Sequence, residues 1–389
     1  MLARFVNRKT TWLLSALPLA VGCSKVADLG DRFRADSPHE AYSHSLERAG
    51  LSGTALARRW TDAASRARTS APQLALPLRQ VGVFSEAEPS APAVRFSARR
   101  GERITASFTV AGDSATLVFL DVFAVDSAVP RTEPQPALAS ADSGRRQITF
   151  EIPRTGSYVL RAQPELLRGG RYTFLVEIGP SLAFPLPGRD GRAIQSLYGA
   201  DRDGGARRHQ GIDIFAPRGT PVTAAVSGVI TNTGITTLGG KVVWLYDARR
   251  GQAIYYAHLD SQIVRPGVEV AVGDTLGLVG NTGNARSTPP HLHFGIYRRG
   301  EGALDPLPFI DPRRRTAPRV IADTSALGTV TRIAARAARL RAAPDEAAAV
   351  VAMLPRDAAV RVDAAIGAWL RVRLDSSESA GFVRATEVR

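Results

Sequence analysis

Four of the six histidines in the chain lie in one stretch, and each has neighbours that suit metal or acid–base chemistry. They are His209, His258, His291 and His293. Asp213 follows His209 by four residues, and Gly211 between them allows the chain to bend. Ile212 and Ile214 flank Asp213, which predicts that the carboxylate enters a strand. This segment therefore offers an imidazole and a carboxylate to one common partner.

A second pair of imidazoles comes from the sequence His291-Leu292-His293. Alternate residues of a strand share a face, so both imidazoles would lie on one side, while Leu292 and Phe294 face the core. Two histidines, one carboxylate and an open fourth position form a catalytic zinc set. Zinc lowers the pKa of its bound water to about 7, which makes a nucleophile at neutral pH. One histidine of the pair and His258 then remain for acid–base work or for stabilising an oxyanion, because there is no His-Glu-x-x-His glutamate.

Three motifs carry a family resemblance. They are His209-Gln210-Gly211-Ile212-Asp213, Tyr256-Ala257-His258-Leu259, and Gly280-Asn281-Thr282-Gly283 leading into Pro290-His291-Leu292-His293-Phe294. Together they resemble the LytM/lysostaphin-type zinc metallopeptidases, from about Phe184 to Pro312. The resemblance implies an antiparallel β groove in which His209, Asp213 and His293 hold one Zn²⁺ per chain. It also implies that His258 and His291 are the catalytic pair, which polarises the water and stabilises the tetrahedral intermediate.

The same resemblance implies a function. We expect a zinc metalloendopeptidase that hydrolyses peptide cross-links of bacterial peptidoglycan, at D-alanyl–diaminopimelate bonds rather than pentaglycine bridges. Residues 239–240 and 281–290 are expected to wall the groove. The alternative is a non-catalytic LytM-type activator or scaffold of wall hydrolases, although such proteins usually lose zinc ligands and all are present here. A third hypothesis is a structural lipoprotein whose other domains bind the wall.

The elements around this site predict a mainly β, multidomain fold. It comprises a short N-terminal helical hairpin, a jelly-roll-like β-sandwich, an antiparallel β LytM-type peptidase domain and a small SH3-like β-barrel. The expected segments are a signal peptide (1–22), a tether (23–36), a helical segment (37–75), the sandwich (76–179), the peptidase domain (180–312), a linker (313–327) and the SH3-like domain (328–389).

The helical segment begins with a capping box, Ser37 followed by Pro38 and Glu40. Its first helix carries His39 and His44, which superficially resemble a zincin pair. Their spacing of five residues places them about 140° apart on a helix, whereas zincin histidines are four residues apart on one face. This spacing excludes a zincin site and favours a solvated helix face.

The two other β segments show strand patterns without a catalytic constellation. Between residues 76 and 179, short β-rich runs are separated by turn signals, which predicts a sandwich. This segment resembles pre-peptidase C-terminal-type jelly rolls, and we expect a spacer or a binding module. Near the C-terminus Leu370, Val372 and Leu374 alternate with arginines, as a half-buried strand requires. That segment resembles bacterial SH3-like domains, which bind wall peptide or simply pack.

The N-terminus predicts export. Arg4, Arg8 and Lys9 precede an apolar run over residues 11–22, which is shorter than the about 20 residues of a transmembrane helix. The run ends at Cys23, the single cysteine, in a sequence that resembles a lipoprotein lipobox. The resemblance implies a lipid anchor at Cys23 and a periplasmic, outer-membrane-anchored lipoprotein. The alternative is an ordinary cleaved signal peptide.

The net charge of +14 comes almost entirely from arginine. Arginine, alanine and proline are frequent along the whole chain, and no single basic block stands out as a nucleic-acid patch. We therefore predict no nucleic-acid partner. A basic surface also suits anionic polymers of the cell envelope.

Overall fold

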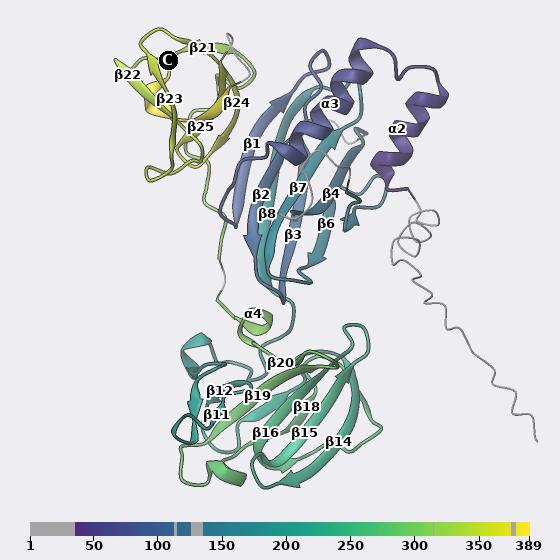
Figure 1. Ribbon diagram of the computed structural model, residues 1–389, viewed down its shortest axis with the longest axis vertical. Helices are drawn as coiled ribbons and strands as arrows, with labels where there is room; N and C mark the ends of the chain where they lie inside the picture. Colours follow the sequence, from purple (N-terminus) through teal and green to yellow (C-terminus); the bar gives the residue numbers. More distant parts are fainter. Residues whose placement is uncertain (1–35, 113–114, 126–134, 314, 375–378) are drawn as a thin grey trace, which may run out of the picture.

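The computed structural model describes residues 36–112, 115–125, 135–313, 315–374 and 379–389, and these form antiparallel sheets with few helices (Figure 1). The prediction of a mainly β fold is confirmed. The predicted signal peptide and the lipid site at Cys23 lie outside the described residues. Within the described part of the chain, no helix is long and apolar enough to span a membrane. The individual segment boundaries stay a prediction.

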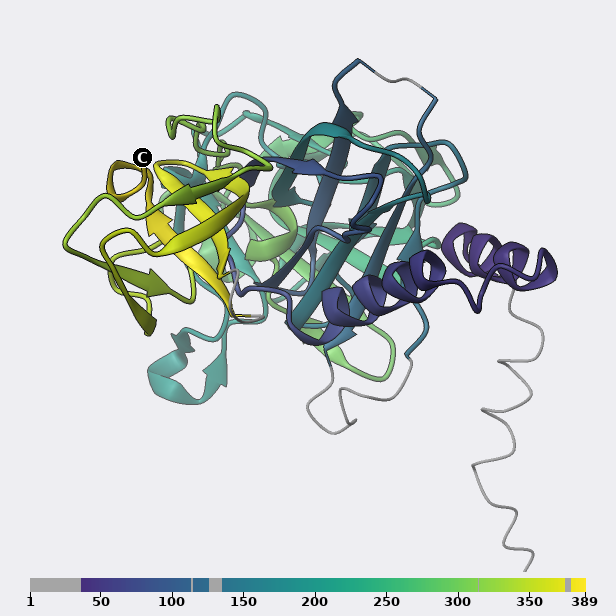
Figure 2. The ribbon, with the colours of Figure 1, turned by 90° about the horizontal axis from the view of Figure 1, so that it is seen from above.

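Two helices, α2 (Pro38–Arg48) and α3 (Ala55–Thr69), precede the strands. The capping box of α2 forms as predicted, because the Ser37 hydroxyl accepts from the Glu40 amide and the Glu40 carboxylate accepts from the Ser37 amide. Helix α3 packs on β7 and β2 through small residues and Trp60, which is only 1% exposed. Figure 2 shows both helices beside the sandwich.

His39 does not lie on a solvated face, so that expectation is wrong for this residue. Its side chain is buried, stacks on the Trp60 ring with centroids 4.5 Å apart, and has Nε2 2.7 Å from Oε1 of Gln163. The face is occupied because α2 lies against the sandwich. Burial, aided by the nearby Arg161 charge, lowers the pKa of His39 to about 4. His44 of the same helix is exposed and pairs with Asp36.

This burial predicts a loss of stability in acid. The pKa of His39 is 6.5 in the unfolded chain and about 4 in the folded chain. The contribution of His39 to the free energy of unfolding is therefore complete above pH 6.5 and is lost as the pH falls toward 4. We expect about 2 kcal/mol less stability at pH 5 than at pH 7 from this residue. Urea unfolding at both pH values in wild type and His39→Gln tests it. An equal pH dependence in both proteins would contradict the assignment.

The sandwich consists of two antiparallel sheets. Its strands are β1 (Leu78–Phe84), β2 (Ala93–Ala98), β3 (Glu102–Val110), β4 (Val118–Val125), β5 (Ala139–Ser140), β6 (Gln147–Glu151), β7 (Gly156–Pro164) and β8 (Gly170–Pro180). One sheet has the order β1-β8-β3-β6 and the other β2-β7-β4-β5. Alternating burial along β1, β3 and β8 directs Phe108, Phe174 and their neighbours into one shared core.

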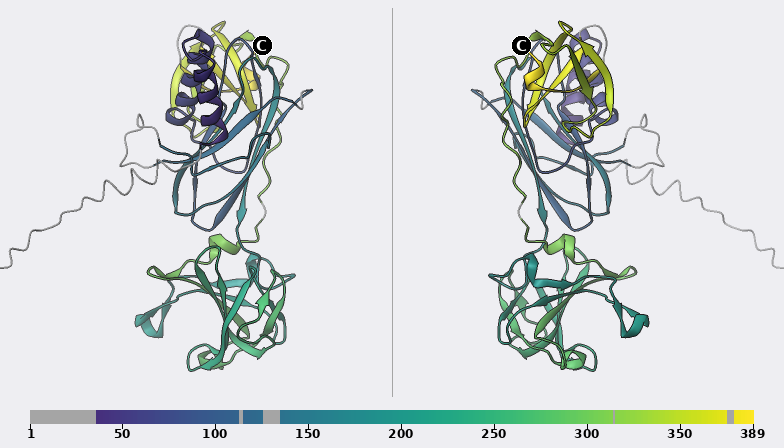
Figure 3. Two further views of the ribbon diagram at one scale, coloured as in Figure 1. Left: turned by 90° about the vertical axis from the view of Figure 1, so that its right-hand side faces the viewer. Right: turned by 90° about the vertical axis from the view of Figure 1, so that its left-hand side faces the viewer.

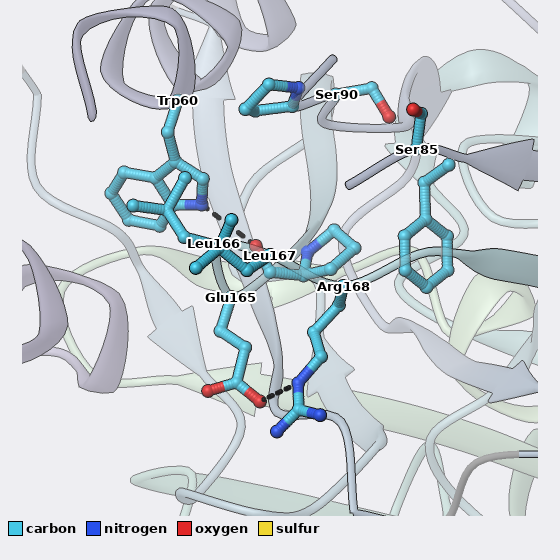
Figure 4. Close-up of a pocket in the computed structure, with 10 residues that line it drawn as sticks. Trp60, Ser85, Ser90, Glu165, Leu166, Leu167 and Arg168 are labelled. Carbon is cyan, nitrogen blue, oxygen red and sulfur yellow. Dashed lines mark hydrogen bonds and ion pairs between the residues drawn. The ribbon is translucent and has the colours of Figure 1, made fainter. Parts of the chain in front are cut away.

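A shallow pocket lies where α3 meets this sandwich (Figure 4). The Trp60 indole donates to the carbonyl of Pro164 over 2.8 Å, and Arg168 pairs with Glu165 at 2.9 Å. Prolines, leucines and serines supply most of the remaining lining. None of the ten residues that line this pocket is a histidine or a cysteine.

The histidine-rich segment forms a separate sheet with its own core. Its strands are β9 (Ile194–Ser196), β12 (Ile212–Phe215), β13 (Pro221–Thr223), β14 (Gly228–Thr236), β15 (Gly240–Asp247), β16 (Gln252–Gln262), β17 (Glu269–Val270), β18 (Thr275–Val279), β19 (His291–Arg298) and β20 (Gly302–Leu304). Between β9 and β12, β10 (Asp201–Arg202) and β11 (Arg207–Arg208) pair only with each other. The order β17-β14-β15-β16-β19-β12-β9 places β16 and β19, which carry three of the four histidines, side by side at its centre. Short helix α4 (Leu307–Ile310) ends the segment.

The C-terminal strands do not close into the predicted small barrel. They are β21 (Val330–Arg332), β22 (Ala337–Arg341), β23 (Val350–Pro355), β24 (Ala359–Ile366), β25 (Trp369–Leu374) and β26 (Ala380–Arg384). In the described residues they form an open sheet, because the edge of β24 pairs with β1 of the sandwich. Gln80 lies opposite Ile366, and the Ile366, Trp369 and Phe382 side chains join the sandwich core. Sandwich and C-terminal strands thus share one ten-stranded sheet.

The histidine-rich domain lies at one end of the sandwich (Figures 1 and 3). Arg250 pairs with Glu151 of β6 at 2.7 Å, and Arg100 pairs with Glu301. The Phe309 ring of α4 lies against Gly101, where any Cβ atom would be only 2.4 Å from the ring. The two ion pairs involve the β15–β16 and β19–β20 turns, at the opposite ends of β16 and β19 from the histidines. The sandwich therefore docks away from the histidine cluster.

Candidate active site

His209 is held just before strand β12 by the backbone on both sides. Its amide donates to the carbonyl of Ala200 and its carbonyl accepts from the amide of Gly199, both over 2.8 Å. Nδ1 lies 2.9 Å from the carbonyl oxygen of Leu197. Because a carbonyl can only accept, Nδ1 carries the proton and donates, which leaves the lone pair of Nε2 free. Nε2 is therefore the atom of His209 that can bind a metal.

Strand register brings Asp213 and His293 together, since they are direct partners in the β12–β19 ladder. Oδ1 of Asp213 is 3.1 Å from Nδ1 of His293 and 3.1 Å from Nε2 of His209. The two ring nitrogens are 3.0 Å apart. Gly211 makes room for this packing as well as for the bend, because a Cβ there would lie 2.5 Å from the Phe294 carbonyl oxygen. Three donor atoms thus converge on one point.

These three residues fit a zinc ion. Donor atoms at zinc distances of 2.0–2.1 Å in a tetrahedron are about 3.3 Å apart, close to the separations here. Among the described residues, His209, Asp213 and His293 form a group whose ligand atoms all lie within 4.8 Å of one another. Burial raises the pKa of Asp213, but the neighbouring His209 and His293 outweigh it and hold the pKa well below its usual value. The carboxylate is therefore charged, as a metal ligand must be.

His258 and His291 lie beside this group with their reactive nitrogens free. Nδ1 of His258 donates to the carbonyl of Thr282 and Nδ1 of His291 to that of Pro289, both over 2.9 Å. The rings are 5.0 Å apart, and Nε2 of His291 is 4.0 Å from Oδ1 of Asp213. Burial, together with the neighbouring His291, lowers the pKa of His258 to about 4. Two imidazoles, each with Nε2 turned away from its backbone hydrogen bond, are thus placed next to the three donors.

The two segments expected to wall the groove contact each other. Gly240 and Gly283 meet so closely that a Cβ on Gly240 would be 2.4 Å from the Gly283 amide. The Thr282 hydroxyl accepts from the Lys241 amide over 2.9 Å and donates to the carbonyl of Leu259 over 2.8 Å. Through its own carbonyl Thr282 also holds His258. The loop after β18 therefore positions one histidine of the pair.

Two features of this face were not predicted from the sequence. Arg202 donates to Oδ2 of Asp213 at 2.6 Å. Three half-buried rings also extend the site. The Tyr255 ring centroid is 5.8 Å from that of His293 and 4.4 Å from that of Trp244. The Trp244 centroid is in turn 5.3 Å from that of Tyr297. The signal for Tyr297 was present, because it is four residues after His293 and so shares its face of β19.

Comparison with known proteins gives a family for this region. Residues 207–306 match the model of peptidase family M23. The chain is 37% identical over 139 residues to the L-Ala–D-Glu endopeptidase of Bacillus subtilis, which covers 33% of the chain and 42% of that protein. It is 36% identical over 115 residues to the peptidoglycan DD-endopeptidase ShyC of Vibrio cholerae, which covers 28% of the chain and 26% of that protein. The chain thus spans less than half the length of these relatives.

One solved structure is similar to part of the chain. The catalytic domain of lysostaphin from Staphylococcus simulans is 30% identical and covers 33% of this chain and 91% of that one, with a TM-score of 0.27. The family match and the relatives' names support a peptidase of the M23, LytM/lysostaphin type in this part of the chain, as predicted. The SH3-like domain and the lipoprotein signal stay predictions.

Proposed function

We propose that the chain is a zinc-dependent endopeptidase that hydrolyses peptide cross-links of bacterial peptidoglycan, at D-alanyl–diaminopimelate bonds. The convergence of the His209, Asp213 and His293 donors within 3.1 Å of one another carries the proposal. The DD-endopeptidase name of one relative supports this bond, whereas the L-Ala–D-Glu endopeptidase name of another makes the stem peptide the main alternative.

His209, Asp213 and His293 would hold the ion, and each of the two neighbouring histidines has a chemical task. Zinc, when bound, supplies a Lewis acid and lowers the pKa of its water. Nε2 of His258 or His291 accepts the proton as the water oxygen bonds to the peptide carbonyl carbon. Its partner, when it carries a proton on Nε2 as well as on Nδ1, donates a hydrogen bond to the oxyanion that develops. The accepted proton passes to the leaving nitrogen as the C–N bond breaks.

The experiment is digestion of purified, cross-linked peptidoglycan by the zinc-loaded full chain, with mass spectrometry of the released peptides. We expect new D-alanine carboxyl ends and free diaminopimelate amino groups. Cleavage between L-alanine and D-glutamate instead would keep the enzyme class and replace the bond. Zinc binding without any new ends would contradict the proposal and favour the non-catalytic activator or scaffold.

The ring cluster beside His293 predicts a binding effect. Trp244 contacts both Tyr255 and Tyr297 on the face that carries the site, so we propose that it helps to form the floor under the substrate. Trp244→Ala should raise KM about tenfold and change kcat little, because the lost contact is worth about 1.4 kcal/mol in both ground and transition states. Tyr246→Ala, an exposed ring on the same strand, is the matched control. A fall in kcat at unchanged KM would contradict this role.

We propose a place in the cell envelope for the whole protein. The peptidoglycan-related names of the relatives support it, as does the predicted export signal. A lipid anchor at Cys23 and wall binding by the SH3-like domain belong to the same proposal. Labelling with a radioactive fatty acid in wild type and Cys23→Ser tests the anchor, because label in the variant would contradict it.

A further inference from the structure

Arg202 contacts the proposed zinc ligand Asp213. It ends β10 in a short hairpin, residues 201–208, that immediately precedes His209. Its Nη2 atom lies 2.6 Å from Oδ2 of Asp213 and 2.7 Å from the hydroxyl of Ser196. The Asp213 carboxylate is only 9% exposed, whereas the Arg202 side chain is 32% exposed. The guanidinium therefore reaches in from the surface to a buried carboxylate.

The two oxygens of Asp213 have different partners. Oδ1 faces Nε2 of His209 and Nδ1 of His293, and Oδ2 faces Arg202. Ser196, the second partner of Arg202, pairs with Asp213 in the β9–β12 ladder and has its hydroxyl 3.3 Å from Nδ1 of His209. The Arg202 guanidinium thus contacts Asp213 directly and is linked to His209 through the Ser196 hydroxyl.

The other arginines of the hairpin do not reach the site. Arg207 pairs with Asp203 at 2.5 Å, and Arg208 pairs with Asp201. Both pairs join residues of the hairpin to each other and are largely exposed. These two pairs stabilise the hairpin locally. Arg202 is the arginine of the hairpin that contacts Asp213. Arg207 is therefore a matched control for Arg202.

The division of the two oxygens has a chemical consequence. Carboxylates bind metal ions through one oxygen or through both, and a charge-assisted hydrogen bond to one oxygen restricts the choice. A second oxygen on zinc would add a fifth ligand and crowd the position that a catalytic site must leave open for water. We propose that Arg202 is a positioning residue that keeps Asp213 a one-oxygen ligand and so keeps the fourth position open. This inference rests on the proposed zinc site.

The test replaces zinc by Co²⁺ in the full chain and compares wild type, Arg202→Met and Arg207→Met. Four-coordinate Co²⁺ absorbs visible light strongly and five-coordinate Co²⁺ weakly. We expect the strong spectrum in wild type and Arg207→Met, and a several-fold weaker one in Arg202→Met. Arg202→Lys should restore the strong spectrum, because an ammonium group can still donate to Oδ2. Competition with a chelator should show zinc bound about 10-fold or more weakly by Arg202→Met.

A wild-type spectrum in Arg202→Met would overturn the inference, whatever happens to the affinity. That failure is distinct from failure of the proposed function. In the second case the wild-type chain itself would bind neither Co²⁺ nor Zn²⁺, or would bind the ion and cleave no peptide.

Discussion

His209→Ala is expected to abolish both zinc binding and peptide hydrolysis. The substitution removes one of three converging donor atoms and leaves Asp213 and His293 as a two-residue site. Loss of an outer-shell partner alone typically weakens metal binding 10- to 100-fold, so loss of a direct ligand should cost more than about 100-fold. Metal content after dialysis and chelator competition measure the effect.

His44→Ala is the control for this substitution, because it removes an exposed histidine that pairs with Asp36 on α2. It should bind zinc and hydrolyse substrate as the wild type does. Retention of one tightly bound zinc by His209→Ala would remove this residue from the ligand set. The same result would favour His291, whose Nε2 is 4.0 Å from Oδ1 of Asp213, as the replacement ligand.

His258→Ala and His291→Ala are expected to keep zinc and lose rate. Both histidines present a free Nε2 beside the three donors and are held by backbone carbonyls rather than by the ligand group. General acid–base catalysis typically contributes 10²- to 10⁴-fold, so kcat should fall by about that factor in each variant. Zinc content and kcat are measured on the same preparations.

The double variant His258→Ala/His291→Ala sharpens this prediction. If the two histidines act as a unit, the double variant should lose little more rate than the worse single variant. Zinc loss from His258→Ala as complete as that from His209→Ala would show that the proposed roles are wrong. Unchanged kcat in either single variant would remove that residue from catalysis.

The sequence predicted the local geometry of the site well. His291 and His293 are two residues apart, which on a strand requires a shared face, and the structure has them on β19 with Leu292 and Phe294 buried beneath. The capping box of α2 was equally predictable from the sequence, because it depends on residues within one turn. Each of these features needs only short-range information.

Contacts between distant segments were not predictable in the same way. His39 is buried by Trp60 and by Gln163, which lies 124 residues away, so its own helix pattern could not show this. The pairing of β24 with β1 joins segments nearly 300 residues apart and depends on an exposed strand edge. Arg202 lies in a two-residue strand within a charge-rich hairpin, where its neighbours give no strand signal.

The shared sheet has a practical consequence. A fragment that begins at residue 180 would lack β1, so it would expose the edge of β24 and would leave Ile366, Trp369 and Phe382 without their sandwich neighbours. Exposed strand edges and apolar patches favour aggregation. All measurements above therefore use the full chain.

The most direct test of the central claim is hydrolysis of a purified cross-linked muropeptide dimer as zinc is returned to the metal-free chain. We predict no hydrolysis without metal and a rate that rises linearly to its maximum at one zinc per chain, because His209, Asp213 and His293 form one site. Full hydrolysis by the metal-free chain, or none with one zinc bound, would contradict the account.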